Sequence, residues 1–230
     1  MKDFDQIAHQ LRTKDPSEIL AWSIKEYGDS ITLASSFGAE DVVLIDKLAR
    51  IRSDIDIFYL DTGLLFPQTY KTRDELARRY NLTFIRVVPR WTVDEQEKEK
   101  GAALWKRDPN QCCHIRKVEP LQKVLSHYKA WITGIRREQS PTRAHTQVVE
   151  WDDTFSICKL NPLAFWKKEE VWDYIHKNKV PYNPLHDQDY PSIGCIPCTR
   201  AVKPGEDPRA GRWSGSAKTE CGLHRNRDQK

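Results

Sequence analysis

Short apolar runs alternate along this chain with longer stretches in which apolar residues recur every three or four positions. The runs cover residues 31–35, 56–60, 83–88 and 130–133, and each is typical of a buried strand. Apolar residues recur at helical spacing in three stretches. These are residues 3–27, the stretch that follows the first apolar run, and the stretch from Pro67 to about Tyr80. The alternation predicts an α/β fold with a mainly parallel sheet flanked by helices.

Polar turns follow three of the predicted strands. They are the Ser/Gly turn that includes Ser35, Ser36 and Gly38, the Asp61-Thr62-Gly63 turn, and the turn at Gly134. The first turn alone fits a structural connection as well as an anion site at a helix N-terminus. Because the carboxyl ends of parallel strands meet at one edge of a sheet, the three turns together predict a ligand site there.

Later segments are more polar. Residues 93–100 (VDEQEKEK) predict a solvated helix, and residues 141–156 predict an exposed, mobile segment near the site. We expect residues 1–199 to form the nucleotide-binding α/β domain and residues 200–230 to form a mobile basic C-terminal segment.

Charge and composition narrow the function classes. Apolar residues make up 39% and charged residues 30% of the chain, as in ordinary globular proteins. The net charge is +4, and residues 200–230 supply it with eight Lys/Arg against four Asp/Glu. A small anionic substrate fits this segment better than nucleic acid, because it has no long basic run. No signal peptide or membrane-spanning run is seen, so we expect a cytoplasmic protein without a membrane partner.

Six cysteines in a reducing compartment indicate metal binding or catalysis before disulfides. Cys112-Cys113 and Cys195-x-x-Cys198 give two thiol pairs, which together could complete a four-thiolate metal site. Neighbouring cysteines chelate one zinc ion awkwardly, whereas a cubane offers each sulfur its own iron, so we favour a [4Fe–4S] cluster over zinc. A redox CxxC with unrelated core cysteines, or disulfides, are the other interpretations. Cys158 lies in a strand-like alternation and is expected to be a buried small hydrophobe.

The sixth cysteine, Cys221, stands in a polar, glycine-containing stretch with little to pack against. His224 and Arg225 follow it, and Arg209, Arg212 and Lys218 precede it. Positive neighbours favour the thiolate, which is the nucleophilic form of cysteine. The sequence therefore predicts a catalytic Cys221 with an anionic electrophile in front of it.

Several of these stretches resemble the assimilatory adenylyl-sulfate/phosphoadenylyl-sulfate reductase family, and the similarity covers nearly the whole chain. They are Ser35–Asp41, Leu60–Gly63, Cys112-Cys113-x-x-Arg116-Lys117, Gly134–Ser140, Gly194–Thr199, Arg209–Trp213 and Glu220–His224. The resemblance implies an adenine-nucleotide alpha-hydrolase-like fold. It also implies reduction of adenylyl sulfate to sulfite and AMP, with a [4Fe–4S] cluster and with thioredoxin or glutaredoxin as electron donor, in a chain that forms homo-oligomers.

The resemblance also assigns roles to residues. Cys221 would attack the sulfate sulfur to form an S-sulfocysteine that thioredoxin resolves, and His224 would assist. The cluster ligands would be Cys112, Cys113, Cys195 and Cys198. The substrate would contact Ser35, Ser36 and Gly38 near its phosphate and Leu60, Asp61, Thr62 and Gly63 near its adenosine. Its phosphosulfate would be neutralised by Lys117, Arg136 or Arg137, Arg209 and Arg212.

The sequence leaves alternatives both for the nucleotide substrate and for the class of protein. Cluster-bearing members are mostly linked to adenylyl sulfate, but the 3′-phosphorylated form is the alternative substrate. A tRNA sulfurtransferase of related fold would require a lysine in the first turn and an RNA-binding module, and neither is seen. A nucleic-acid-binding redox sensor would show no turnover at all.

Overall fold

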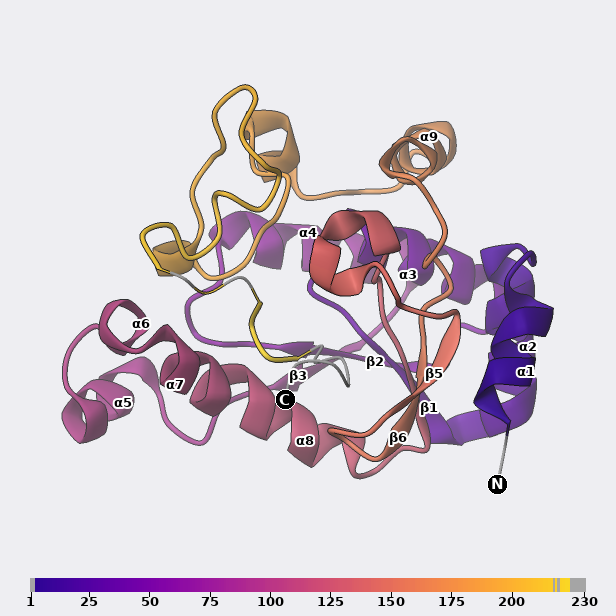
Figure 1. The fold of residues 1–230 in the computed structure, drawn as a ribbon, viewed down its shortest axis with the longest axis horizontal. Helices are drawn as coiled ribbons and strands as arrows, with labels where there is room; N and C mark the ends of the chain where they lie inside the picture. The colour runs from indigo at the N-terminus through magenta and orange to yellow at the C-terminus, as the bar shows by residue number, and fades with distance from the viewer. Residues whose placement is uncertain (1–2, 217, 219, 224–230) are drawn as a thin grey trace.

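The computed structural model describes residues 3–216, 218 and 220–223 of the chain, and its centre is a six-stranded sheet (Figure 1). The strand order is β3-β2-β1-β4-β6-β5. All neighbours run parallel except β5 and β6, which run antiparallel. The predicted mainly parallel sheet is confirmed. Its strands are β1 (Ile31–Ala34), β2 (Asp56–Leu60), β3 (Phe84–Val87), β4 (Ala130–Ile132), β5 (Val149–Asp152) and β6 (Ile157–Leu160).

Local sequence signals mark the ends of several helices. The Asp15 carboxylate and the Glu18 side chain form a capping box at the start of α2, whose first residue is Pro16. Pro67 likewise opens α4, which ends at Tyr80 before the left-handed Asn81. The α-helices are α1 (Phe4–Leu11), α2 (Pro16–Tyr27), α3 (Ala39–Ile51), α4 (Pro67–Tyr80), α5 (Val93–Lys100), α6 (Leu104–Arg107), α7 (Pro109–Cys113), α8 (Glu119–Leu125) and α9 (Lys168–Asn178).

Helices cover both faces of the sheet because successive strand side chains point to opposite sides. On one face, Leu33 of β1 packs in the same core cluster as residues of α2, α3, α4 and α9. On the other face, Phe58 of β2 and Trp131 of β4 pack with Leu121 and Leu125 of α8. Figure 1 shows α3, α4 and α9 on one side of the sheet and α8 on the other. Among the described residues, no helix is long and apolar enough to cross a membrane.

Two expectations for polar segments need correction. The segment 141–156 is not simply exposed, since it contains the 3-10 helix η4 (Pro141–Arg143) and the edge strand β5, with Val149 1% exposed. Its strand was missed because Val149 and Trp151 alternate with Glu150 and Asp152, so no continuous apolar run marks it. Residues 93–100 do form a helix, but Gln96 is 0% exposed because its side chain faces the cysteines and not solvent.

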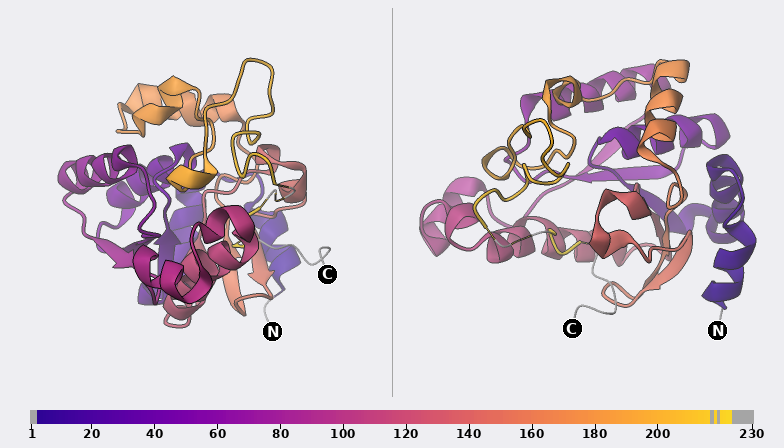
Figure 2. Two further views of the ribbon diagram at one scale, coloured as in Figure 1. Left: turned by 90° about the vertical axis from the view of Figure 1, so that its left-hand side faces the viewer. Right: turned by 45° about the horizontal axis from the view of Figure 1, so that its top comes forward.

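The segment after η5 (Pro184–Gln188) folds back on itself beside α7 (Figure 2). The backbone N–H of Val202 donates to the Asp189 carbonyl, and Thr199 pairs with Arg212. Lys218 Nζ donates to Asn110 Oδ1 of α7 at 2.6 Å. These contacts join residues on both sides of position 199, where the sequence predicts the boundary between the α/β domain and the C-terminal segment. That boundary remains a prediction.

Candidate active site

A cavity of about 790 Å³ lies where β1, β2 and β4 end. Because these strands are parallel, the three polar turns meet at one edge of the sheet, as the sequence predicted. The cavity is also lined by the folded-back segment and by Cys221. The predicted residues that line it are Ser35, Ser36, Gly38, Leu60, Thr62, Lys117, Arg136, Arg209, Arg212 and Cys221. Asp61, Gly63 and Arg137 are not among its lining residues, and His224 lies outside the described residues.

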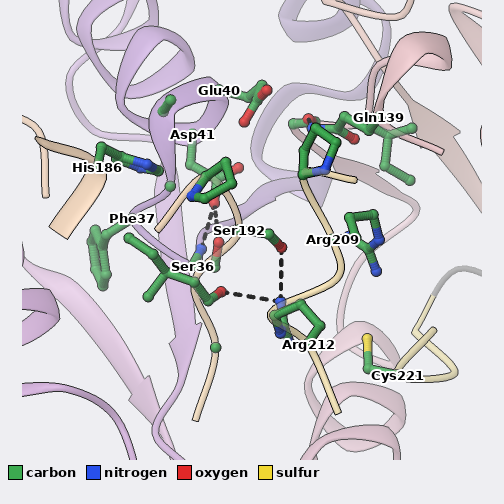
Figure 3. A pocket seen from close by; sticks show the side chains of 18 of the residues that line it. Ser36, Phe37, Glu40, Asp41, Gln139, His186, Ser192, Arg209, Arg212 and Cys221 are labelled. Atoms are coloured by element: carbon green, nitrogen blue, oxygen red, sulfur yellow. Dashed lines mark hydrogen bonds between the residues drawn. The ribbon is translucent and has the colours of Figure 1, made fainter. Parts of the chain in front are cut away.

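Asp41, at the start of α3, fixes the turn after β1. Its Oδ2 accepts from the Ser36 backbone N–H at 2.6 Å and from Ser36 Oγ at 2.8 Å (Figure 3). Phe37 adopts a left-handed backbone with φ 59°, and its N–H donates to Ser35 Oγ. Burial raises the pKa of Asp41 to about 6, although the Ser36 hydrogen bonds oppose this. The turn is therefore held in a bent, preorganised shape by its own side chains.

Asp61 anchors the second turn from behind the cavity. It is 2% exposed and accepts from Tyr70 Oη at 2.6 Å, Arg86 Nε at 2.6 Å and the Gly63 backbone N–H at 3.0 Å. Burial alone would raise its pKa, but these donors outweigh burial and hold the pKa below its usual value. This geometry presents Thr62 to the cavity.

The neighbouring Arg136 and Arg137 point to different places. Arg136 lines the cavity, and its Nε donates to Glu40 Oε1 at 2.8 Å while Nη1 donates to Glu138 Oε2 at 2.9 Å. Arg137 instead lies over the Phe165 ring, 4.2 Å from its centroid, and donates to the Thr146 carbonyl. Only Arg136 of the two thus reaches the cavity.

Arg212 lies at the junction of the main cavity and a smaller one, and it lines both. Its Nη1 donates to Ser192 Oγ at 3.1 Å and to the Ile193 carbonyl at 3.3 Å (Figure 3). Its Nε is buried and has no hydrogen-bond partner among the described residues. Figure 3 shows Cys221 on the same side of the cavity as Arg209 and Arg212. Among the described residues, the hydrogen bonds that orient the Arg212 guanidinium thus come from Nη1.

The four paired cysteines meet in the smaller cavity. Cys112, Cys113, Cys195 and Cys198 all line it, with Lys117 and Trp213 beside them. The first pair ends α7, immediately before the π-helix η2 (His114–Val118), an irregularity often found at functional sites. All six cysteines are described, and none forms a disulfide. Cys158 lies apart from them on β6 and is 1% exposed, which confirms its predicted burial.

A hydrogen-bond network joins the two cysteine pairs. Thr62 Oγ1 lies 3.3 Å from Cys195 Sγ, and Gln96 Nε2 donates to Cys112 Sγ at 3.9 Å. Arg116, 3% exposed, links them because its Nε donates to the Thr62 carbonyl at 2.6 Å and its Nη1 to Gln96 Oε1 at 3.1 Å. Gln96 was missed from the sequence, although it is the only uncharged polar residue in its acidic and basic run.

The thiols and Lys117 influence one another. Burial raises the pKa of Cys112 and of Cys198 to about 11, so both are neutral as free thiols and would lose their protons on metal binding. Burial tends to lower the pKa of Lys117, but nearby Cys195, Cys221 and Cys113 raise it overall. Among the described residues, no three His, Cys, Asp or Glu side chains are grouped to hold a single metal ion.

Sequence reasoning also missed Arg143, which lines the main cavity from η4. Its Nη2 lies 3.0 Å from Glu220 Oε2. An arginine within a polar stretch gave no signal, because nothing in the local sequence points to a carboxylate 77 residues away.

Comparison with known proteins identifies relatives of this chain. Residues 30–201 match the family described as phosphoadenosine phosphosulfate reductase domain. A protein of Geobacillus kaustophilus (strain HTA426) named adenosine 5′-phosphosulfate reductase is 50% identical over 213 residues, which cover 92% of this chain and 91% of that protein.

Solved structures agree as well. The crystal structure of phosphoadenylyl-sulfate (PAPS) reductase from Candida auris, a phosphate complex, has TM-score 0.78 and 29% identity over 87% of this chain and 98% of that one. FMN adenylyltransferase of Candida glabrata, with TM-score 0.57 and 17% identity over 79% of this chain and 59% of that one, shares the fold alone. The expected adenine-nucleotide alpha-hydrolase-like fold is confirmed. With a matching domain, a relative at half identity and a shared architecture, the chain belongs to the phosphoadenosine phosphosulfate reductase domain family.

Proposed function

We propose that this chain reduces adenylyl sulfate to sulfite and AMP, with Cys221 as the nucleophile. The observation that carries the proposal is that Cys221 lines the same cavity as the strand-end turns and three basic side chains, those of Lys117, Arg209 and Arg212. The relative from Geobacillus kaustophilus bears the name of this activity. A thiol beside several cations suits attack on an anionic sulfur.

The reaction balances in three successive displacements. The Cys221 thiolate attacks the sulfate sulfur, the bond from that sulfur to the phosphate oxygen breaks, and AMP leaves with the bonding pair. A thiolate of thioredoxin, or of glutaredoxin, then attacks Cys221 Sγ and releases sulfite, forming a mixed disulfide. The donor's second thiol resolves that disulfide, so the donor loses two electrons and Cys221 returns as a thiol.

The residues around the cavity would bind and orient the substrate. Ser35, Ser36 and Gly38 would face its phosphate, because their turn precedes the N-terminus of α3. Lys117, Arg209 and Arg212 would neutralise the charge that builds on the phosphosulfate as AMP departs. Arg136, rather than Arg137, would serve as the basic residue after β4. His224 keeps its proposed assisting role from the sequence alone.

The four cysteines of the smaller cavity would hold a [4Fe–4S] cluster. Each of four irons takes one cysteine, so the sulfurs need not converge on a single centre, as they must at zinc. Their common cavity supports this proposal. When bound, the cluster would supply a fixed negative charge beside Lys117 without exchanging electrons.

Arg116 supports an anionic occupant. Its described acceptors are all neutral, namely the carbonyls of Thr62, Trp91 and Thr92 and the amide of Gln96. A buried guanidinium whose hydrogen-bond acceptors are all neutral is costly unless negative charge lies near, and Asp61 supplies part of that charge. Cysteine thiolates that bind a cluster would add to it.

The proposal is tested by incubating the purified protein with sulfur-labelled adenylyl sulfate and no thioredoxin. We expect label bound covalently to Cys221, absent in Cys221→Ser and present in Cys158→Ala, the matched control for loss of a thiol elsewhere. Addition of thioredoxin should release the label as sulfite. Failure of the wild type, with intact iron–sulfur absorbance, to form the adduct would refute the proposed mechanism.

The same assay addresses selectivity. We propose adenylyl sulfate as the substrate because the curated relative carries that name, although the structural neighbour is a PAPS reductase. Label transfer from the 3′-phosphorylated nucleotide at an equal rate would show that the chain accepts both. We further propose that the enzyme acts in sulfate assimilation toward cysteine, in the cytoplasm, as a homo-oligomer.

A further inference from the structure

Glu220, the residue before the nucleophile, is held by more polar contacts than its position near the end of the chain would suggest. Its side chain is 13% exposed. Its Oε1 accepts from Arg143 Nε at 3.1 Å, from Thr142 Oγ1 at 3.2 Å and from Ser140 Oγ at 3.3 Å. Its Oε2 accepts from Arg143 Nη2 at 3.0 Å and from Arg209 Nη2 at 3.1 Å. Ser140, Thr142 and Arg143 lie in a distant part of the chain, whereas Arg209 belongs to the same C-terminal segment as Cys221.

The Arg143 side chain forms the strongest of these attachments. It meets both carboxylate oxygens through two nitrogens, the bidentate arrangement in which an arginine fixes direction as well as distance. The Arg143 side chain is only 12% exposed and that of Arg209 17%, so water screens the pairs weakly. Burial tends to raise the pKa of Glu220, but Arg143 and Arg209 lower it overall.

Arg143 is itself fixed to the sheet. Its Nη1 donates to Gln139 Oε1 at 2.5 Å, and Gln139 Nε2 donates to the Gly134 carbonyl at 3.2 Å. Gly134 closely follows β4, where a Cβ would lie 2.4 Å from Asp41 Oδ1 of the first turn. A continuous chain of contacts thus runs from the end of β4 to the residue beside Cys221.

We propose that Glu220 is the positioning residue that holds Cys221 in the cavity. This inference rests on the proposed function, because it takes Cys221 as the nucleophile. The Glu220 carboxylate docks on Ser140, Thr142, Arg143 and Arg209, and the adjoining peptide then places the thiol among the residues that line the cavity. Fixing the reacting atom in advance lowers the entropic cost of attack.

The test measures how well Cys221 is held, independently of turnover. Substrate-free enzyme is alkylated with iodoacetamide over a range of pH, and peptide mass spectrometry follows Cys221 alone. Removing a nearby carboxylate could also favour the thiolate, but that effect moves only the midpoint of the pH profile. The plateau rate at high pH, where the thiol is fully ionised, reports access to the sulfur.

We expect the plateau to rise at least about tenfold in Glu220→Gln and further in Glu220→Ala, since a charge-assisted contact is worth about that much. The matched control is Asp54→Asn, which breaks an ion pair with Arg52 at 2.8 Å outside the cavity and should leave the plateau unchanged. Circular dichroism melting should show that all variants remain folded.

The second readout is the rate at which the adduct forms in a single turnover. In Glu220→Gln we expect that rate to fall about tenfold or more while the dissociation constant for adenylyl sulfate stays within about threefold. An unchanged alkylation plateau would overturn the inference. So would a retained adduct rate with much tighter substrate binding, which would show that Glu220 only competes with the substrate for the arginines. If the wild type forms no adduct, the proposed function fails, whereas the plateau still reports whether Glu220 holds this segment.

Discussion

Gly194 leaves the space that the Arg212 guanidinium occupies. A Cβ at Gly194 would lie 2.4 Å from Arg212 Nη2 and 2.7 Å from Arg212 Cζ, well inside van der Waals contact. The third of the three nearest atoms, Nε at 3.1 Å, also belongs to Arg212. Because the clash is with the end of a flexible side chain, Gly194→Ala should be relieved by movement of Arg212 and not by the backbone.

The movement would break the contacts that orient Arg212, those with Ser192 Oγ and the Ile193 carbonyl. An arginine that no longer faces the phosphosulfate loses a charge-assisted hydrogen bond, worth about 1.5–3 kcal/mol. We therefore expect kcat/KM for adenylyl sulfate to fall by about 10- to 150-fold in Gly194→Ala. The free energy of unfolding should change by only about 1 kcal/mol, because the core is untouched.

Steady-state kinetics and urea unfolding measure the two quantities. If the alanine acts through Arg212, Gly194→Ala/Arg212→Ala should be no slower than Arg212→Ala alone. Gly215→Ala is the control for glycine replacement, since Gly215 has φ +85° and nothing within 4 Å of its Cβ, so it adds backbone strain without displacing an arginine. A Gly194→Ala enzyme with kcat/KM within about threefold of wild type, or additive losses in the double variant, would refute the reasoning.

Three further predictions follow from the site. Cys112→Ala should abolish the iron–sulfur absorbance of anaerobically purified protein while Cys158→Ala keeps it, and a colourless wild type with stoichiometric zinc would contradict the cluster. Arg136→Ala should raise KM for adenylyl sulfate about tenfold or more, whereas Arg137→Ala should mainly lower the melting temperature, because Arg137 packs on a ring outside the cavity; equal KM values would count against this. The Asp41 carboxyl, with its pKa raised to about 6 in the folded state, binds its proton more tightly there than in the unfolded chain, so its contribution to stability declines as pH rises from about 4 to about 6. Urea unfolding across that range should show the decline in wild type and a flatter profile in Asp41→Asn.

Local sequence was enough to predict the helices and strands of the repeated strand–turn–helix unit. Pro67 and the polar turn before it marked α4, and the apolar run 56–60 gave β2 with the bounds seen in the structure. A buried parallel strand must be apolar on both faces, so its run stands out in any sequence. The edge strand β5 escaped because Val149 and Trp151 alternate with Glu150 and Asp152, so the strand contains no continuous apolar run.

The sequence by itself determined the alternation of strands and helices, the convergence of three polar turns and the presence of two cysteine pairs that could share a metal site. These features follow from periodicity and residue type, which local physical chemistry governs. Only the tertiary structure decided which of Arg136 and Arg137 reaches the cavity, since adjacent side chains diverge according to what packs around them. It also decided that Gln96 turns inward to Cys112 and that Glu220 meets Arg143. These contacts join residues far apart in the chain, and no local pattern encodes the distance between side chains that only folding brings together.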